Sequence, residues 1–134
     1  MQLSGSARKT VVVAVALGVG ALHFVTGPQY AGPWPAFVNG YLIDILLPLS
    51  LYLLTGMIEK PWVTSWLRSI AVLAAGAGVE TLQYFGYHVL GSTFDPYDYL
   101  AYAAGVIGGI VLEALLFGGP ARSPGQGLGE NGGP

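Results

Sequence analysis

Four long apolar runs divide the chain, and short polar or Pro- and Gly-rich segments separate them. The runs cover residues 10–26, 37–58, 63–85 and 96–117. Each is close to the roughly 20 residues that a helix needs to cross the apolar core of a bilayer. The apolar residues are continuous rather than alternating, which favours helices over the strands of a membrane barrel. We therefore predict an all-α integral membrane bundle of four transmembrane helices.

The flanking segments complete the predicted organisation. Residues 1–9 form a short N-terminal segment, residues 10–117 form the membrane domain, and residues 118–134 form a flexible tail rich in Gly and Pro. Arg8 and Lys9 precede the first run as they would in a signal peptide. No pattern of small residues for cleavage follows, so we expect this run to be kept as a span.

The composition supports a membrane protein and excludes several other classes. Hydrophobic residues make up 53% of the chain and charged residues 9%, against about 25% charged in an average soluble domain. Five basic residues and a net charge of −2 do not suit a nucleic-acid-binding protein. The chain has no cysteine, no i, i+4 pair of histidines, no phosphate-binding loop and no nucleophile motif, so we predict neither a metal site nor a cofactor.

The basic residues predict the orientation. Arg8, Lys9, Lys60, Arg68 and Arg122 all fall on one side of the four predicted spans. Because basic residues accumulate on the cytoplasmic side of membrane proteins, we expect both termini to be cytoplasmic. The predicted location is the cell (inner) membrane, with the lipid bilayer as the surrounding partner.

Four of the seven acidic residues fall on the opposite, outer side. Asp44 lies about 10 Å and Glu80 about 8 Å inside their predicted spans, while Asp95 and Asp98 stand at the start of the last one. Acidic residues inside a membrane are costly and usually face a bundle interior or a wet cavity. We therefore predict an acidic pocket that opens outward, whose carboxyl groups are protonated or bind a cation, an amine or donor side chains.

The helical spacing adds further candidates to this predicted pocket. Glu80, Gln83 and Tyr84 share one helical face, and His88 lies in the outer loop as a possible acid–base partner. Pro48 lacks an N–H and frees the carbonyl of Asp44, four residues earlier. The predicted ligand-binding residues are Asp44, Glu80, Gln83, Tyr84, His88, Asp95 and Asp98.

Purely structural roles are open for several of these residues. The segment around Asp95 is typical of a capped helix start. Asp95 is followed directly by Pro96, and Asp98 stands three residues after Asp95. Glu80 and Gln83 can form interhelical hydrogen bonds that serve packing alone.

Two further groups are predicted to hold helices together. Glu113 and Arg68 lie near the inner ends of their spans and are expected to form a snorkelling ion pair. Ala101, Gly105 and Gly109 form a stripe of small residues that allows close helix packing. The same stripe could join the chain to a second copy or to a larger membrane complex.

The chain resembles the VanZ-like family of small multi-pass membrane proteins over residues 37–117. The resemblance lies in E-T-L-Q-Y-F at residues 80–85, in D-P-Y-D at residues 95–98 with the Gly-rich continuation, and in the helix around Asp44. Many members have Arg near residues 91–93 and Asn where this chain has Ala101 or Tyr102. The resemblance implies a multi-pass envelope protein, with a link to resistance against the glycopeptide teicoplanin through the founding member, but it implies no reaction.

Three functions are compatible with these features. The first is an envelope protein whose acidic pocket binds a small or lipid-linked ligand. The second is a non-catalytic accessory subunit of a larger membrane complex. The third is an intramembrane enzyme acting on lipid-linked substrates of the outer leaflet. A non-catalytic role is favoured, because no catalytic motif is present, and a proton or cation pathway is disfavoured, because the inner halves of the spans carry few polar residues.

Overall fold

The computed structural model describes residues 4–26, 29–88 and 94–118, and this part of the chain is helical, without strands. An all-α fold is thus confirmed for the described residues. The elements are α1 (Gly5–Val25), α2 (Pro35–Phe37), the π-helix η1 (Val38–Leu42), α3 (Ile43–Thr55), α4 (Ser65–Tyr84) and α5 (Asp98–Phe117). Each of the four predicted spans corresponds to a long helix or, for the second span, to the continuous segment from α2 to α3.

Three helical segments are long and apolar enough to cross a membrane: Gly5–Val25, Pro35–Thr55 and Asp98–Phe117. The helix α4 has 20 residues but is less apolar, because it contains Arg68 and Glu80. The structure therefore gives three candidate spans where the sequence predicted four.

The helix starts follow from local capping rather than from the edges of the apolar runs. The Ser4 side chain accepts a hydrogen bond from the backbone of Ala7, so α1 begins at Gly5, well before the predicted start of the span. The Thr64 side chain does the same for Leu67 at the start of α4. Side-chain oxygens at these positions bind backbone N–H groups that have no partner inside the helix.

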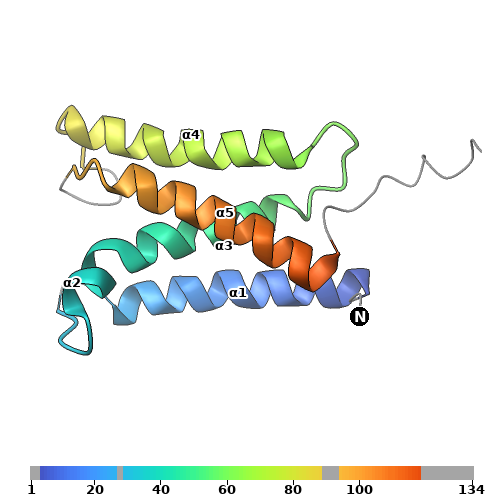
Figure 1. Ribbon diagram of the computed structural model, residues 1–134, viewed down its shortest axis with the longest axis horizontal. Coiled ribbons are helices and arrows are strands. Elements are labelled where there is room, and N and C mark those ends of the chain that lie inside the picture. Colours follow the sequence, from blue (N-terminus) through green and yellow to red (C-terminus); the bar gives the residue numbers. More distant parts are fainter. Residues whose placement is uncertain (1–3, 27–28, 89–93, 119–134) are drawn as a thin grey trace, which may run out of the picture.

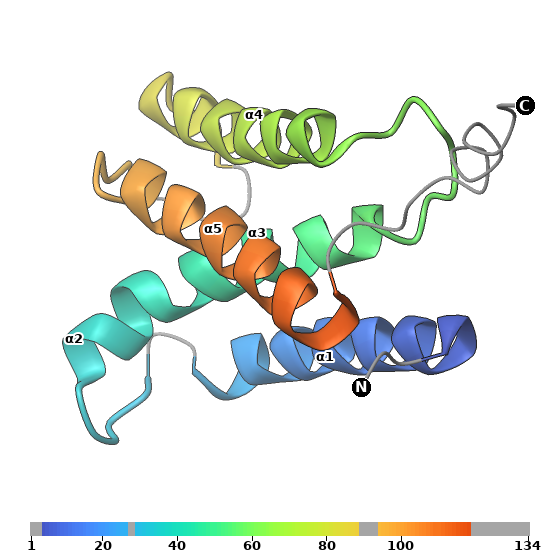
Figure 2. The same cartoon turned by 45° about the vertical axis from the view of Figure 1, so that its right-hand side comes forward.

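The helices α3 and α5 cross at the centre of the molecule (Figures 1 and 2). The helix α1 packs along α3 on one side, while α4 packs along α5 on the other. The buried core joins all four long helices and consists of Val12, Tyr52, Leu53, Val72, Val106 and Phe117. Large apolar side chains also point outward, among them Leu17, Leu100 and Leu115, as they do in helices that face lipid.

Glycines allow the central helices to approach closely. A Cβ on Gly105 would overlap the carbonyl oxygen of Ile45 in α3, and one on Gly109 would come within 2.8 Å of the Tyr52 ring. Ala101, on the same face of α5, is 6% exposed. The predicted close packing is confirmed for Gly105 and Gly109, which lie against α3.

The segment from α2 to α3 is irregular at its beginning. Trp34 adopts a left-handed backbone conformation just before Pro35, and the wide π-turn of η1 follows. Pro48 lies inside α3, where its missing N–H leaves the carbonyl of Asp44 without a helical partner. Wide turns of this kind occur mostly as short insertions in α-helices, often beside functional residues.

Charge is separated between the two ends of the bundle. The start of α1, the connection between α3 and α4, and the start of α4 lie at one end (Figure 1), and these segments carry Arg8, Lys9, Lys60 and Arg68. The end of α4 and the start of α5 lie at the other end, with Glu80, Asp95 and Asp98. The predicted separation is therefore present in the fold for the described residues, and Arg122 lies outside them.

Candidate functional site

Glu80 is the most deeply buried of the four acids assigned to the predicted pocket. Its side chain, in the last third of α4, is 2% exposed. The hydroxyl of Tyr102 in α5 donates a hydrogen bond of 2.9 Å to Oε1 of Glu80. The ring of Tyr102 also packs against Gly76, one turn before Glu80, where a Cβ would come within 2.7 Å of it. This small residue lets α4 and α5 approach closely enough for the hydrogen bond to form.

Asp98 lies beside Glu80. Its side chain belongs to the first turn of α5, four residues before Tyr102, and the residue is 8% exposed. The two carboxyl groups interact electrostatically. Oε2 of Glu80, however, is buried without a hydrogen-bond donor among the described residues.

Asp44 brings a third carboxyl group from α3. It is half-buried and interacts electrostatically with Glu80 and with His23 at the end of α1. The charge of Asp98 interacts with Asp44 as well. The structure thus brings three predicted residues from three different helices to one place. We call Asp44, Glu80 and Asp98 the acidic cluster.

Asp95 stands at the edge of the acidic cluster and holds a turn. Its side chain accepts hydrogen bonds from the backbone N–H of Tyr97 (2.9 Å) and from the hydroxyl of Tyr41 (3.3 Å). The side chain of Asp95 does cap a backbone N–H group, as predicted. The predicted helix start at residue 96 is wrong. Asp95 caps the turn that precedes α5, because the regular helix begins only at Asp98.

The other predicted site residues lie further out. Gln83 is half-buried, one turn beyond Glu80. Tyr84 is 67% exposed and its ring packs edge-on against Phe85 and Phe94. His88 is exposed. Tyr84 and His88 are thus exposed, unlike Glu80 and Asp98, which are buried.

The cluster has no strong cation nearby. All four lysines and arginines of the described part lie at the opposite end of the bundle, while His23 interacts electrostatically with Asp44. Among the described residues, no three His, Asp or Glu side chains are arranged to hold a metal ion. The arrangement suits a proton or a nitrogen cation that donates hydrogen bonds.

Sequence reasoning missed the tyrosines and the histidine around the cluster. Tyr102 follows Asp98 by four residues, so the two share a helical face, and this spacing could have revealed it. Tyr41 and His23 come from segments far apart along the chain. Their approach depends on how α1 and η1 pack, which no local pattern indicates.

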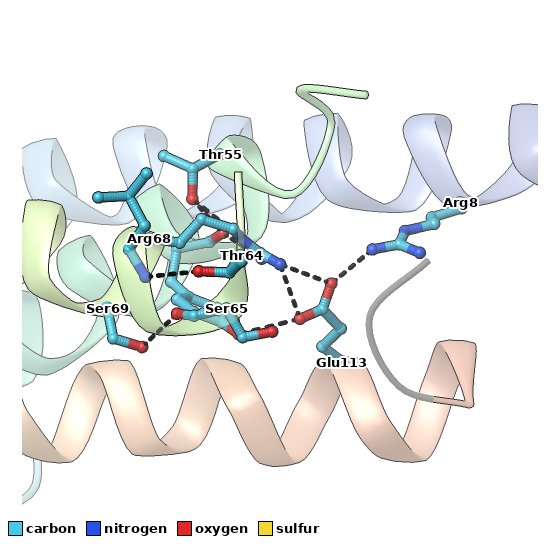
Figure 3. Close-up of polar contacts among 9 residues, drawn as sticks. Arg8, Thr55, Thr64, Ser65, Arg68, Ser69 and Glu113 are labelled. Atoms are coloured by element: carbon cyan, nitrogen blue, oxygen red, sulfur yellow. Dashed lines mark hydrogen bonds and ion pairs between the residues drawn. The ribbon is translucent and has the colours of Figure 1, made fainter. Parts of the chain in front are cut away.

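A second polar cluster lies at the basic end (Figure 3). Nη1 of Arg68 lies 3.1 Å and 3.2 Å from the two carboxylate oxygens of Glu113. Arg8 donates to the same carboxylate, and the Tyr52 hydroxyl donates to it at 3.0 Å. The remaining donors of Arg68 bind the carbonyl of Tyr52 (2.8 Å) and the hydroxyl of Thr55 (3.3 Å).

The predicted ion pair of Arg68 and Glu113 is confirmed, but its environment differs from the prediction. The two side chains are 5% and 2% exposed, so the pair is buried between helices instead of snorkelling to an interface. The participation of Arg8 was not predicted. Since the four groups come from α1, α3, α4 and α5 and bind one another, this cluster has a structural role.

Comparisons of the chain with family models, curated proteins and solved structures give no match. The resemblance to the VanZ-like family stays a prediction. The chemistry of the acidic cluster is therefore inferred from its own geometry.

Proposed function

We propose that this chain is a VanZ-like protein of the cell membrane whose acidic cluster faces outward and binds a small or lipid-linked ligand that carries an amine. The observation that carries this proposal is the convergence of Asp44, Glu80 and Asp98 from three helices, with every lysine and arginine of the described part at the opposite end. Buried carboxyl groups without a cationic partner are costly and mark ligand sites.

Packing supports α4 as a fourth span. Its two charged residues, Arg68 and Glu80, are buried against other helices, at 5% and 2% exposed. Its exposed side chains include Trp66, Ile70 and Leu82. The outward surface of α4 is thus more apolar than its sequence average, which suits a helix that meets lipid.

The distribution of charge supports the orientation. Basic residues favour the cytoplasmic side, and the end that carries Arg8, Lys9 and Lys60 would lie there together with both termini. The acidic cluster then faces outward, where a lipid-linked molecule of the outer leaflet can reach it.

An amine suits the cluster better than other ligands. A primary ammonium group supplies a positive charge and three N–H donors, and ionised carboxylates are acceptors only. Charge-assisted hydrogen bonds of this kind are about twice as strong as neutral ones. An anionic ligand would meet like charges.

The binding test uses the purified protein in nanodiscs. Short-chain phosphatidylethanolamine, which carries an amine, should raise the melting temperature in a concentration-dependent way, while short-chain phosphatidylglycerol should not. The double variant Asp44→Asn with Glu80→Gln should lose this response, and Glu59→Gln, at the other end, should keep it. An equal response to both lipids, or an unchanged response in the double variant, contradicts the proposal.

The resemblance gives a second readout in cells. We expect production of the protein to raise the tolerance of a sensitive host to teicoplanin, and the double variant to lose this effect at equal membrane abundance. Glu59→Gln serves as the matched control.

A further inference from the structure

The two oxygens of the Glu80 carboxyl group have different surroundings. Oε1 accepts a hydrogen bond of 2.9 Å from the hydroxyl of Tyr102. Oε2 is buried and has no hydrogen-bond donor within the described part of the chain. A buried acceptor without a donor is costly, and most buried polar atoms in proteins do have a partner. Oε2 is therefore an atom to which a ligand can supply the missing donor.

The packing of α4 against α5 decides which oxygen lacks a donor. Gly76 stands four residues before Glu80, on the same face of α4. It leaves room for the ring of Tyr102, since a Cβ there would come within 2.7 Å of this ring. Tyr102 is 7% exposed, so packing holds the phenol where it donates to Oε1. Tyr102 is thus a positioning residue for the carboxyl group of Glu80.

We propose that Oε2 of Glu80 accepts a hydrogen bond from the ligand nitrogen, so that the acidic cluster selects ammonium groups that carry at least one N–H. This inference rests on the proposed function and names the class of amine within it. Primary, secondary and tertiary ammonium groups can donate, whereas a quaternary ammonium group has the same charge but no N–H to donate. Charge alone does not separate these classes, and the unfilled acceptor does.

The burial of Oε2 favours the same classes. A donated N–H brings the nitrogen to about 3 Å from the oxygen, while the methyl groups of a quaternary ammonium keep the nitrogen further away. Oε2 is covered by protein atoms, and a small N–H group has to displace less of this cover than three methyl groups. Asp44 is only half-buried, so water can serve its acceptors when a cation has no N–H. The selection therefore depends on Glu80.

The experiment compares a series of headgroups with the purified protein in nanodiscs of phosphatidylglycerol, which carries no amine. The probes are short-chain phosphatidylethanolamine, its N-methyl and N,N-dimethyl derivatives, and phosphatidylcholine. Their nitrogens carry three, two, one and no N–H, while their net charge is the same. We expect the first three to raise the melting temperature with similar affinity. Phosphatidylcholine should bind about tenfold more weakly or less, because a charge-assisted hydrogen bond is lost.

Two variants separate the hydrogen bond from the charge. Glu80→Asp keeps the charge but draws the carboxyl group back, and it should bind the ethanolamine and choline lipids about equally. Tyr102→Phe removes the donor that holds Oε1 and should reduce the difference between the two lipids. The ratio of the two affinities is the readout, because a general loss of stability would weaken both lipids alike. Glu59→Asp, at the basic end, is the matched control and should keep the full ratio.

Two outcomes would overturn the inference alone. Equal binding of phosphatidylcholine and phosphatidylethanolamine by the unmodified protein would show that the nitrogen donates nothing to Oε2, although a cationic headgroup is still bound. An unchanged ratio in Glu80→Asp, with normal helix content and elution volume, would place the selective acceptor elsewhere. If no lipid of the series binds, the proposed function itself fails and this inference fails with it, so the two failures are distinguishable.

Discussion

Arg68 of α4 and Glu113 of α5 form an ion pair that is almost fully buried, with one guanidinium nitrogen 3.1 Å and 3.2 Å from the two carboxylate oxygens. The guanidinium group also lies 4.1 Å from the centre of the Tyr52 ring. Burial of a charge is tolerated when all its donors and acceptors are bound. Here the pair joins α4 to α5 and fixes how the two helices meet.

Removal of the acid alone should destabilise the protein strongly. Glu113→Gln leaves Arg68 and Arg8 without their shared anion, and the loss of one partner of a buried pair costs about 3–5 kcal/mol. Chemical denaturation in mild detergent measures the loss.

The double variant Arg68→Met with Glu113→Met is expected to recover part of that stability, because it leaves no unpaired charge at position 68, while Arg8 and the Tyr52 hydroxyl still lose their acceptor. The exposed pair of Lys9 and Glu59, 2.9 Å apart, is the control, and Lys9→Met should change stability little. A small effect of Glu113→Gln would contradict the structural role.

Gly105 should tolerate no side chain. Gly105→Ala places a Cβ against the carbonyl of Ile45 and near Cβ of Pro48, so α3 and α5 must separate. Overpacking of this kind costs about 1–3 kcal/mol.

Gly78 is the matched control, because nothing lies within 4 Å of a Cβ there. Gly78→Ala should be neutral or stabilise the helix by up to about 1 kcal/mol. Equal effects of the two variants in thermal unfolding would rule out the close approach of α3 and α5.

Glu59 should titrate below its ordinary range. A hydrogen bond and the charge of Lys9 lower the pKa of this carboxyl. Its stabilising contribution is therefore present above the unperturbed pKa of glutamate, roughly 4.3, and is lost as the pH falls through the lower folded value. Lys9→Met should return the pKa of Glu59 to its ordinary value, and Lys60→Met should not. Carbon NMR of the side-chain carboxyl follows both, and an unshifted pKa in the unmodified protein would exclude the pair in solution.

The orientation can be tested with single cysteines, since the chain has none. In intact cells a membrane-impermeant maleimide should label Tyr87→Cys, at the acidic end, where the native side chain is 63% exposed. The variant Lys60→Cys, at the basic end, should react only after the membrane is opened. Labelling of both positions, or of the second alone, would reverse or exclude the proposed topology.

Much of the fold was predictable because it depends on local and periodic features. Continuous apolar runs predicted the long helices, and the stripe with Gly105 and Gly109 predicted close packing. The charges of Arg68 and Glu113, at matched positions of two helices, predicted their pair. The start of α5 was misplaced by two residues, because Asp95 caps a turn instead of the helix itself.

The sequence by itself determined the helical class, the separation of basic from acidic ends and the residues able to form a site, since all three follow from composition and order along the chain. The tertiary structure alone decided which acids meet. Glu80 of α4 meets Tyr102 of α5, four residues after Asp98, because Gly76 leaves room for the ring of Tyr102. Tyr84 and His88, close to them in sequence, remain exposed. Helix packing decides which acidic side chains are buried and which lie near one another. The binding properties proposed for the acidic cluster depend on both.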